Sequence, residues 1–131
     1  MAASEGRLLV KLSFIRLELA RTPEFPQGSP AHGYEFVAPL TADSHIDADA
    51  FREVKERCEV TRFWGAETQN GRLRHVGKGW RFDYDEADDS DDEPFFKLER
   101  HALTPGAYVS VTEQDGVQRP FKVVSVTPLG A

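Results

Sequence analysis

The second half of the chain is a series of short segments in which apolar and polar residues alternate, separated by turn residues. In Trp80–Tyr84 the three aromatic rings share one face and the charged residues share the other, which is typical of a strand with one buried face. Asn70-Gly71 and Asp115-Gly116 supply the residues that a type I′ hairpin turn needs at its two central positions, where φ is positive. This half therefore predicts antiparallel strands joined by hairpins.

The first half predicts two further strands. In Ile15–Leu19, apolar residues alternate with polar ones. Leu8–Phe14 alternates in the opposite phase, which a bulge near Phe14–Ile15 would reconcile, and a helix over 8–14 is the alternative. Thr22–Gly33 contains three prolines and two glycines, which predicts an ordered connection outside any ladder, and Tyr34–Leu40 follows as the second strand.

One helix is predicted between the two halves. Asp47 can cap its N-terminus, because the carboxylate accepts hydrogen bonds from the free amides of the first turn. Ile46 and Phe51 then occupy the positions of a hydrophobic staple. Phe51, Val54 and Cys58 follow at helical spacing, which predicts one narrow buried face.

Together these elements predict a mainly β fold. Seven or eight strands, one helix and mostly short connections favour a small antiparallel barrel, closed or partly open, with the helix covering one end. We expect a single domain over residues 1–131. Within it, residues 1–14 form an N-terminal extension or the first strand, and residues 83–94 form an acidic loop.

Charge and cysteine content bear on the cellular compartment of the protein. The 22 acidic and 16 basic residues give a net charge of −6, and eight of the acidic residues lie in Asp83–Glu93. The single cysteine, Cys58, cannot form an intrachain disulfide, which favours a reducing compartment. No secretory signal is recognisable, and no apolar run approaches the roughly 18 residues of a membrane span. We expect a cytoplasmic protein without membrane contact, as a monomer or a homodimer.

The acidic segment raises the question of metal binding, because hard cations bind carboxylate oxygens. An EF-hand needs glycine at the sixth position of its loop. Loops that start at Asp83 or Asp89 place Asp88 or Pro94 there. We therefore expect no metal site, and we favour a solvated connection between two strands.

The segment before it, residues 61–82, is basic and aromatic. Basic groups beside exposed rings suit single-stranded nucleic acid, and the acidic loop would compete with such a ligand. The alternation instead favours buried rings, which cannot stack on bases. The residues concerned are Arg62, Arg72, Arg74, Lys78 and Arg81 with Phe63, Trp64, Trp80 and Phe82.

Catalytic motifs are missing from the sequence. Neither a Gly-x-Ser-x-Gly elbow nor a glycine-rich phosphate loop occurs. Cys58 falls on the apolar face of the predicted helix, which favours an inert buried thiol. The histidines lack metal-ligand spacing, so no catalytic residue, metal or cofactor is predicted. These histidines are His32, His45, His75 and His101.

Four segments carry a resemblance: IRLELARTPEFP (15–26), HGYEFVAPL (32–40), RFWG (62–65) and PGAYVSV (105–111). They resemble a family of small, uncharacterised bacterial proteins over Ile15 to Pro128. The resemblance implies a single bacterial domain, and it implies no activity, cofactor or site residue.

The sequence does not specify an activity. The leading hypothesis is a non-enzymatic β-barrel module that binds a protein or a small ligand. The first alternative is a ligand-binding or enzymatic barrel with a pocket near His32, Glu35, Arg62 and Trp64, and the second is a nucleic-acid-binding barrel modulated by the acidic loop. The candidate ligand-binding residues are His32, Glu35, Arg62, Trp64, Arg72, Arg74 and Trp80.

Overall fold

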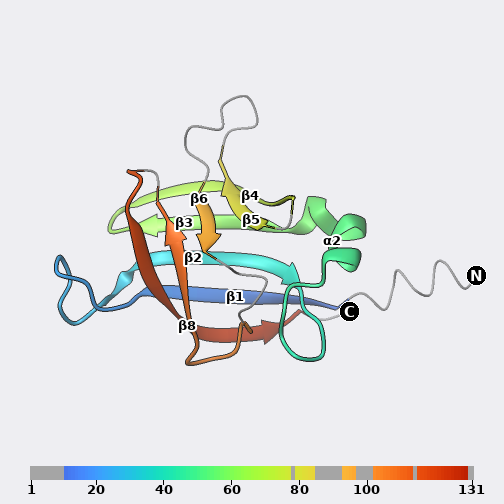
Figure 1. Cartoon of the computed structure of the whole chain (residues 1–131), viewed down its shortest axis with the longest axis horizontal. Coiled ribbons are helices and arrows are strands. Elements are labelled where there is room, and N and C mark those ends of the chain that lie inside the picture. The colour runs from blue at the N-terminus through green and yellow to red at the C-terminus, as the bar shows by residue number, and fades with distance from the viewer. Residues whose placement is uncertain (1–10, 78, 85–92, 97–101, 114, 130–131) are drawn as a thin grey trace, which may run out of the picture.

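The computed structural model describes residues 11–77, 79–84, 93–96, 102–113 and 115–129. These residues contain one α-helix, α2 (Ala48–Val54), followed by a 3-10 turn, η1 (Lys55–Arg57) (Figure 1). The strands are β1 (Leu12–Leu19), β2 (Ser29–Pro39), β3 (Glu59–Trp64), β4 (Glu67–Val76), β5 (Gly79–Asp83), β6 (Glu93–Phe96), β7 (Tyr108–Thr112) and β8 (Gln118–Pro128).

The strands form the predicted antiparallel barrel. Each strand pairs with the next along the chain, and β8 pairs with β1 to close the sheet. Closure is weakest at β6, which contributes two residue pairs to β5 and two to β7. Without β6, the other strands would form a curled half-barrel that is open between β5 and β7.

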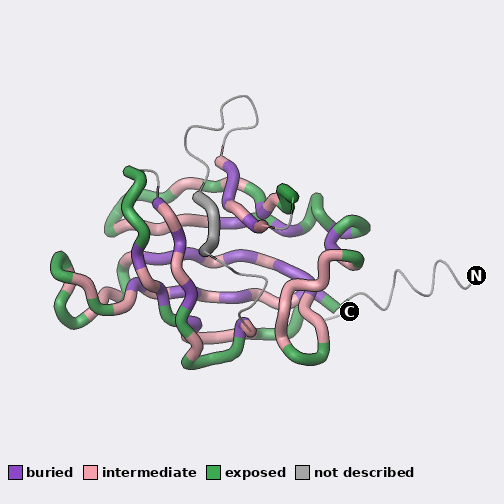
Figure 2. The backbone as a smooth tube through the Cα atoms, in the orientation of Figure 1, coloured by how far each residue is buried: buried purple, intermediate pink, exposed green. Residues whose placement is uncertain are grey.

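Buried residues occur along the strands of the barrel (Figure 2), and their side chains form one hydrophobic core. Tyr34, Phe36, Phe82 and Phe121 are fully buried, and their rings pack with centroids 4.8 to 5.2 Å apart. The prediction that Trp80 and Phe82 belong to the core is confirmed, since Trp80 is only 4% exposed. The alternation of aromatic residues in β5 therefore marked the buried face correctly.

The predicted helix covers one end of the barrel. The Asp47 carboxylate accepts a hydrogen bond from the backbone N–H of Ala50 at 3.0 Å, which confirms the cap. Phe51 packs edge-on against the Trp80 ring at 5.0 Å, and Val54 is buried beside it. Cys58, which follows η1, is completely buried, and burial raises the pKa of its thiol to about 12.

The prediction of a hairpin turn at Asn70-Gly71 is wrong. Both residues lie inside β4, opposite β3, and the turn between these strands is Gly65-Ala66. A Cβ atom on Gly71 would lie 2.4 Å from the carbonyl oxygen of Asp83. Glycine is needed here because two backbones approach closely, and not for a turn. The second turn, at Asp115-Gly116, does connect β7 and β8, but it is not of type I′, because Gly116 has a φ of 81° whereas the φ of Asp115 is not positive.

The bulge lies elsewhere than predicted. The pairing of β1 runs through Phe14–Ile15 without a shift. Its register shifts instead between Arg16 and Leu17 against β8, and between Glu18 and Leu19 against β2. Residues 1–10 lie outside the described part of the chain, so the helix alternative for 8–14 is tested only at its end, where the chain is a strand.

Strand β2 begins at Ser29, five residues before the predicted start. Leu19 pairs with Ser29 whereas Glu18 pairs with Gly33, so residues 30–32 bulge out of the ladder with β1. Pro30 is tolerated there because a bulge needs no ladder N–H from it.

The acidic segment connects two paired strands. β5 and β6 are antiparallel neighbours, as predicted, and residues 85–92 between them lie outside the described part of the chain. The predicted loop bounds of 83–94 are too wide, because Asp83 ends β5 and is buried, and Glu93 and Pro94 belong to β6. None of the helices in the described ranges has the length and apolar character that crossing a membrane requires.

Candidate functional site

The end of the barrel opposite α2 contains a cluster of inward-pointing polar side chains. We call it the mouth cluster, and it comprises Tyr34, Arg62, Glu113 and Arg119. Strand phase explains why charged residues point inward. Arg62 shares the face of Val60 on β3, and Arg119 shares the face of Phe121 on β8. Glu113 continues the inward phase of β7 just beyond the strand.

Glu113 is the centre of the cluster. Its side chain is 2% exposed, and its Oε2 atom accepts hydrogen bonds from the Tyr34 hydroxyl at 2.8 Å and from Nη2 of Arg62 at 3.2 Å. Its Oε1 atom accepts a bond from Nη1 of Arg119 at 3.1 Å. A carboxylate can be buried only with such partners, because unpaired burial would cost several kcal/mol.

Arg119 connects this buried centre to the rim. Its Nη1 and Nη2 atoms each donate to one oxygen of Asp115 at 3.0 Å, and its Nε atom donates to Glu24 at 3.1 Å. The hydrogen bond from Arg119 lowers the pKa of Asp115, and the same bond raises the pKa of Arg119. The Arg119 side chain is 11% exposed, whereas those of Glu24 and Asp115 are more than half exposed.

Aromatic rings form one wall of the mouth. The His32 ring lies 4.6 Å from the Phe25 ring and 4.6 Å from the Trp64 ring. The guanidinium of Arg62 lies over the Trp64 ring at 4.4 Å, a cation–π arrangement. Ser29 fixes the His32 ring, because its Oγ and the ring Nδ1 are 2.7 Å apart.

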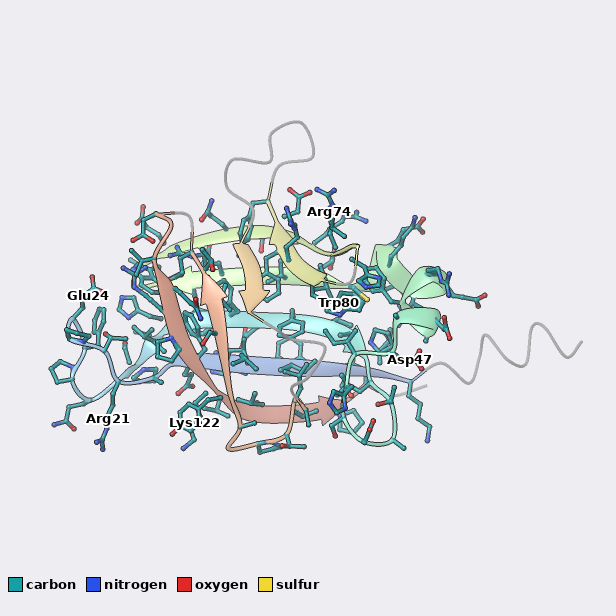
Figure 3. The ribbon with its side chains drawn as sticks, in the orientation of Figure 1. Arg21, Glu24, Asp47, Arg74, Trp80 and Lys122 are labelled. Carbon is teal, nitrogen blue, oxygen red and sulfur yellow. The ribbon has the colours of Figure 1, made fainter. Side chains whose placement is uncertain are left out.

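A recess of about 480 Å³ lies between the charged residues and this wall. Phe25 and Trp64 supply its apolar lining, and Arg62, Arg119, Glu24, Glu113 and Asp115 supply its charges. The volume falls in the usual range of a small-molecule site, but the lining is mainly charged, with the two aromatic rings as its apolar part. In Figure 3, Glu24 marks this end of the barrel and Trp80 marks the end beside α2.

The structure brings together three of the predicted site residues. His32, Arg62 and Trp64 meet at the mouth, since His32 and Trp64 face each other across β2 and β3. Glu35 does not join them. Its neighbours Tyr34 and Phe36 point inward, so Glu35 points outward and pairs with Arg16 at 2.8 Å.

The other predicted site residues lie away from the mouth. Arg72 is exposed on β4, and Nη1 of Arg74 donates to Asp83 at 2.6 Å. Trp80 is buried beneath α2, with the His75 ring stacked on it at 4.1 Å. A second recess of about 580 Å³ lies here, and it contains both Arg72 and Arg74.

Residues 61–82 do not form one exposed basic and aromatic face in the described structure. Trp80 and Phe82 are buried, and Arg62 points into the mouth. Lys78 lies outside the described residues. The surface that the nucleic-acid hypothesis requires is therefore not found in the described part of this segment.

Sequence reasoning missed Glu113, Arg119, Glu24 and Asp115. A signal for two of them was present, because Glu113 and Arg119 continue the inward alternation of β7 and β8. Charged residues at inward positions of adjacent strands indicate a buried ion cluster. Glu24 carried no comparable signal, since it lies in the connection between β1 and β2.

Metal ligands do not cluster in the described ranges, where no group of three or more His, Cys, Asp or Glu side chains could hold an ion. The Ser29–His32 pair is the arrangement at the mouth that most resembles catalytic machinery. The Ser29 oxygen also accepts a hydrogen bond from the backbone N–H of Ala31, which is a local turn contact.

Comparison with protein-family models, with curated proteins and with solved structures gave no match. The resemblance to small bacterial proteins therefore stays a prediction. The function has to be argued from the geometry of the mouth.

Proposed function

We propose that the protein is a non-enzymatic binding module that takes up a small ligand at the mouth of its barrel. The observation that carries this proposal is the recess of about 480 Å³, in which an aromatic wall faces two arginines. A ligand there could pack a flat group against Trp64 and hydrogen-bond to charged groups at the same time.

The binding groups are already in position. Glu113 holds Arg62 and Arg119 from inside the barrel, and all three side chains lie on or next to strands. Binding to such a site loses little side-chain entropy, because the rotamers are fixed before the ligand arrives. This preorganisation supports a role in recognition.

A small ligand is favoured over a protein partner. Large exposed hydrophobic residues would be expected to gather on a protein-binding face. In the described structure they lie on separate segments: Val76, Tyr108, Val117 and Leu129.

An enzymatic barrel is the alternative, and the Ser29–His32 pair would have to carry its chemistry. The single buried cysteine and the resemblance to bacterial proteins support a bacterial cytoplasmic setting.

The two tryptophans provide the test, since Trp64 lies at the mouth and Trp80 beneath α2. We expect aromatic fragments from a screened library to shift the indole N–H resonance of Trp64 in NMR spectra and to leave that of Trp80 in place. Trp64→Ala should abolish binding of these fragments, measured by calorimetry, while the Trp80 resonance keeps its position. Fragments that bind only beside Lys55 and Arg74, in the recess near α2, would contradict the proposal.

A further inference from the structure

We propose that the ligand of the mouth is a small aromatic carboxylate, and that its carboxylate replaces that of Glu24 on Arg119. This inference rests on the proposed function and names the class of ligand. It follows from a difference among the three acidic partners of Arg119.

Two of these partners are held firmly. Glu113 is buried and accepts hydrogen bonds from Tyr34 and Arg62 as well. Asp115 binds Arg119 through both oxygens and also accepts a bond from the backbone N–H of Val117. Removing either carboxylate would break several hydrogen bonds at once.

Glu24 is held weakly. It makes a single hydrogen bond to Arg119 within the described residues, and its side chain is 59% exposed. It also comes from a connection 95 positions away in the sequence, whereas Asp115 lies four positions from Arg119. Because an exposed ion pair contributes little stability, a ligand can replace Glu24 at small cost.

A freed hydrogen-bond donor favours an anion as the replacement. With Glu24 displaced, the N–H at Nε of Arg119 has lost the acceptor that Glu24 supplied, whereas the two Nη atoms stay bonded to Glu113 and Asp115. A ligand carboxylate can accept this hydrogen bond and replaces the negative charge that Glu24 removes, so the recess keeps its three carboxylates against two guanidiniums. A cationic ligand has no acceptor to offer to this donor.

The position of the apolar wall defines the rest of the ligand. Phe25 adjoins Glu24 in the sequence and lines the same recess as Trp64. A carboxylate placed on Nε of Arg119 would therefore have an aromatic surface beside it. A flat ring joined to the carboxylate by a short linker suits this arrangement.

Three probes with the same ring separate the possibilities: phenylacetate, the neutral phenylacetamide and the cationic phenethylamine. We expect phenylacetate to shift the Trp64 indole resonance at the lowest concentration and to leave the Trp80 resonance unchanged. Equal or tighter binding of either other probe overturns the carboxylate assignment while the proposed mouth stands. If no probe shifts Trp64, both proposals fail.

A matched pair of variants tests the replacement of Glu24. We expect Glu24→Gln to tighten phenylacetate binding by roughly two- to fivefold, because the competing ion pair is lost. Glu67→Gln removes the same charge from the same end of the barrel, since Glu67 faces Trp64 across β3 and β4, and it should leave the affinity unchanged. If the two substitutions changed the affinity equally, the gain would come from the lower negative charge alone. The proposed replacement of Glu24 by the ligand carboxylate would then be wrong.

Discussion

The two ends of the barrel are closed by opposite means. At the helix end, Phe51 and His75 pack against Trp80, and the closure is mainly apolar. At the mouth, Glu113 and Arg119 fill the interior and satisfy each other. The side chains named at the helix end come from α2, β4 and β5, and those at the mouth come mainly from β2, β3 and β8. Apolar packing is the more effective stabiliser, because a buried ion cluster loses most of its Coulomb energy to desolvation. The polar mouth is consistent with a role in recognition.

The strongest test of this comparison removes the charge at the centre of the mouth. We expect Glu113→Gln to lower the free energy of unfolding by about 3–5 kcal/mol, because Arg62 and Arg119 lose the buried carboxylate that they share, although Arg119 keeps Asp115 and Glu24. Urea denaturation measures the change. The exposed Glu67→Gln variant should stay within about 0.5 kcal/mol of the parent. A loss below about 1 kcal/mol for Glu113→Gln would mean that the mouth is not held by this carboxylate.

The second test removes the apolar closure at the other end. We expect Phe51→Ala to cost about 3 kcal/mol, since the substitution leaves a cavity between α2 and Trp80. The indole resonance of Trp80 should shift, because its ring contacts Phe51, and that of Trp64 should not, because Trp64 lies at the opposite end of the barrel. A shift of both resonances would show that the ends are coupled, and the comparison between them would fail.

The smallest expected effect concerns pH. The pKa of Asp115 is lowered in the folded protein by its hydrogen bond to Arg119, so its contribution to stability is present above the unfolded pKa of about 3.9 and is lost as the pH falls through the folded pKa. Although the Asp115 side chain is 53% exposed, it binds Arg119 through both oxygens, so we expect Asp115→Asn to cost about 1 kcal/mol at pH 7. The difference from the parent should vanish below the folded pKa. Asp49→Asn is the control, because it removes an exposed carboxylate of α2, and its effect on stability should show no pH dependence that involves Arg119. A stability difference between Asp115→Asn and the parent that persists in strong acid would contradict the assignment.

Alternation predicted much of the fold. The rings of β5, the capped helix and the number of strands followed from local patterns, because each depends on residues close together in the sequence. The turn at Asn70-Gly71 could not be predicted correctly. A glycine needed for positive φ and a glycine needed for close backbone approach look the same in a sequence. Only the contact between Gly71 and the end of β5 distinguishes them.

Only the part of the site that lies on neighbouring strands was predicted from the sequence. His32, Arg62 and Trp64 lie on two neighbouring strands, so local reasoning could group them. Tyr34 and Glu113 are 79 positions apart, and no local pattern relates them.

By itself the sequence determined which side chains point into a barrel, because strand geometry places alternate residues on one face. It also determined that one end would be covered by a helix with an apolar face. Only the tertiary structure decided that Glu113 and Arg119 would meet Tyr34 and Arg62, since closure of β8 against β1 brings these strands to one end. The physical reason is that a buried charge is stable only beside its partners, and which partners it has depends on register and closure.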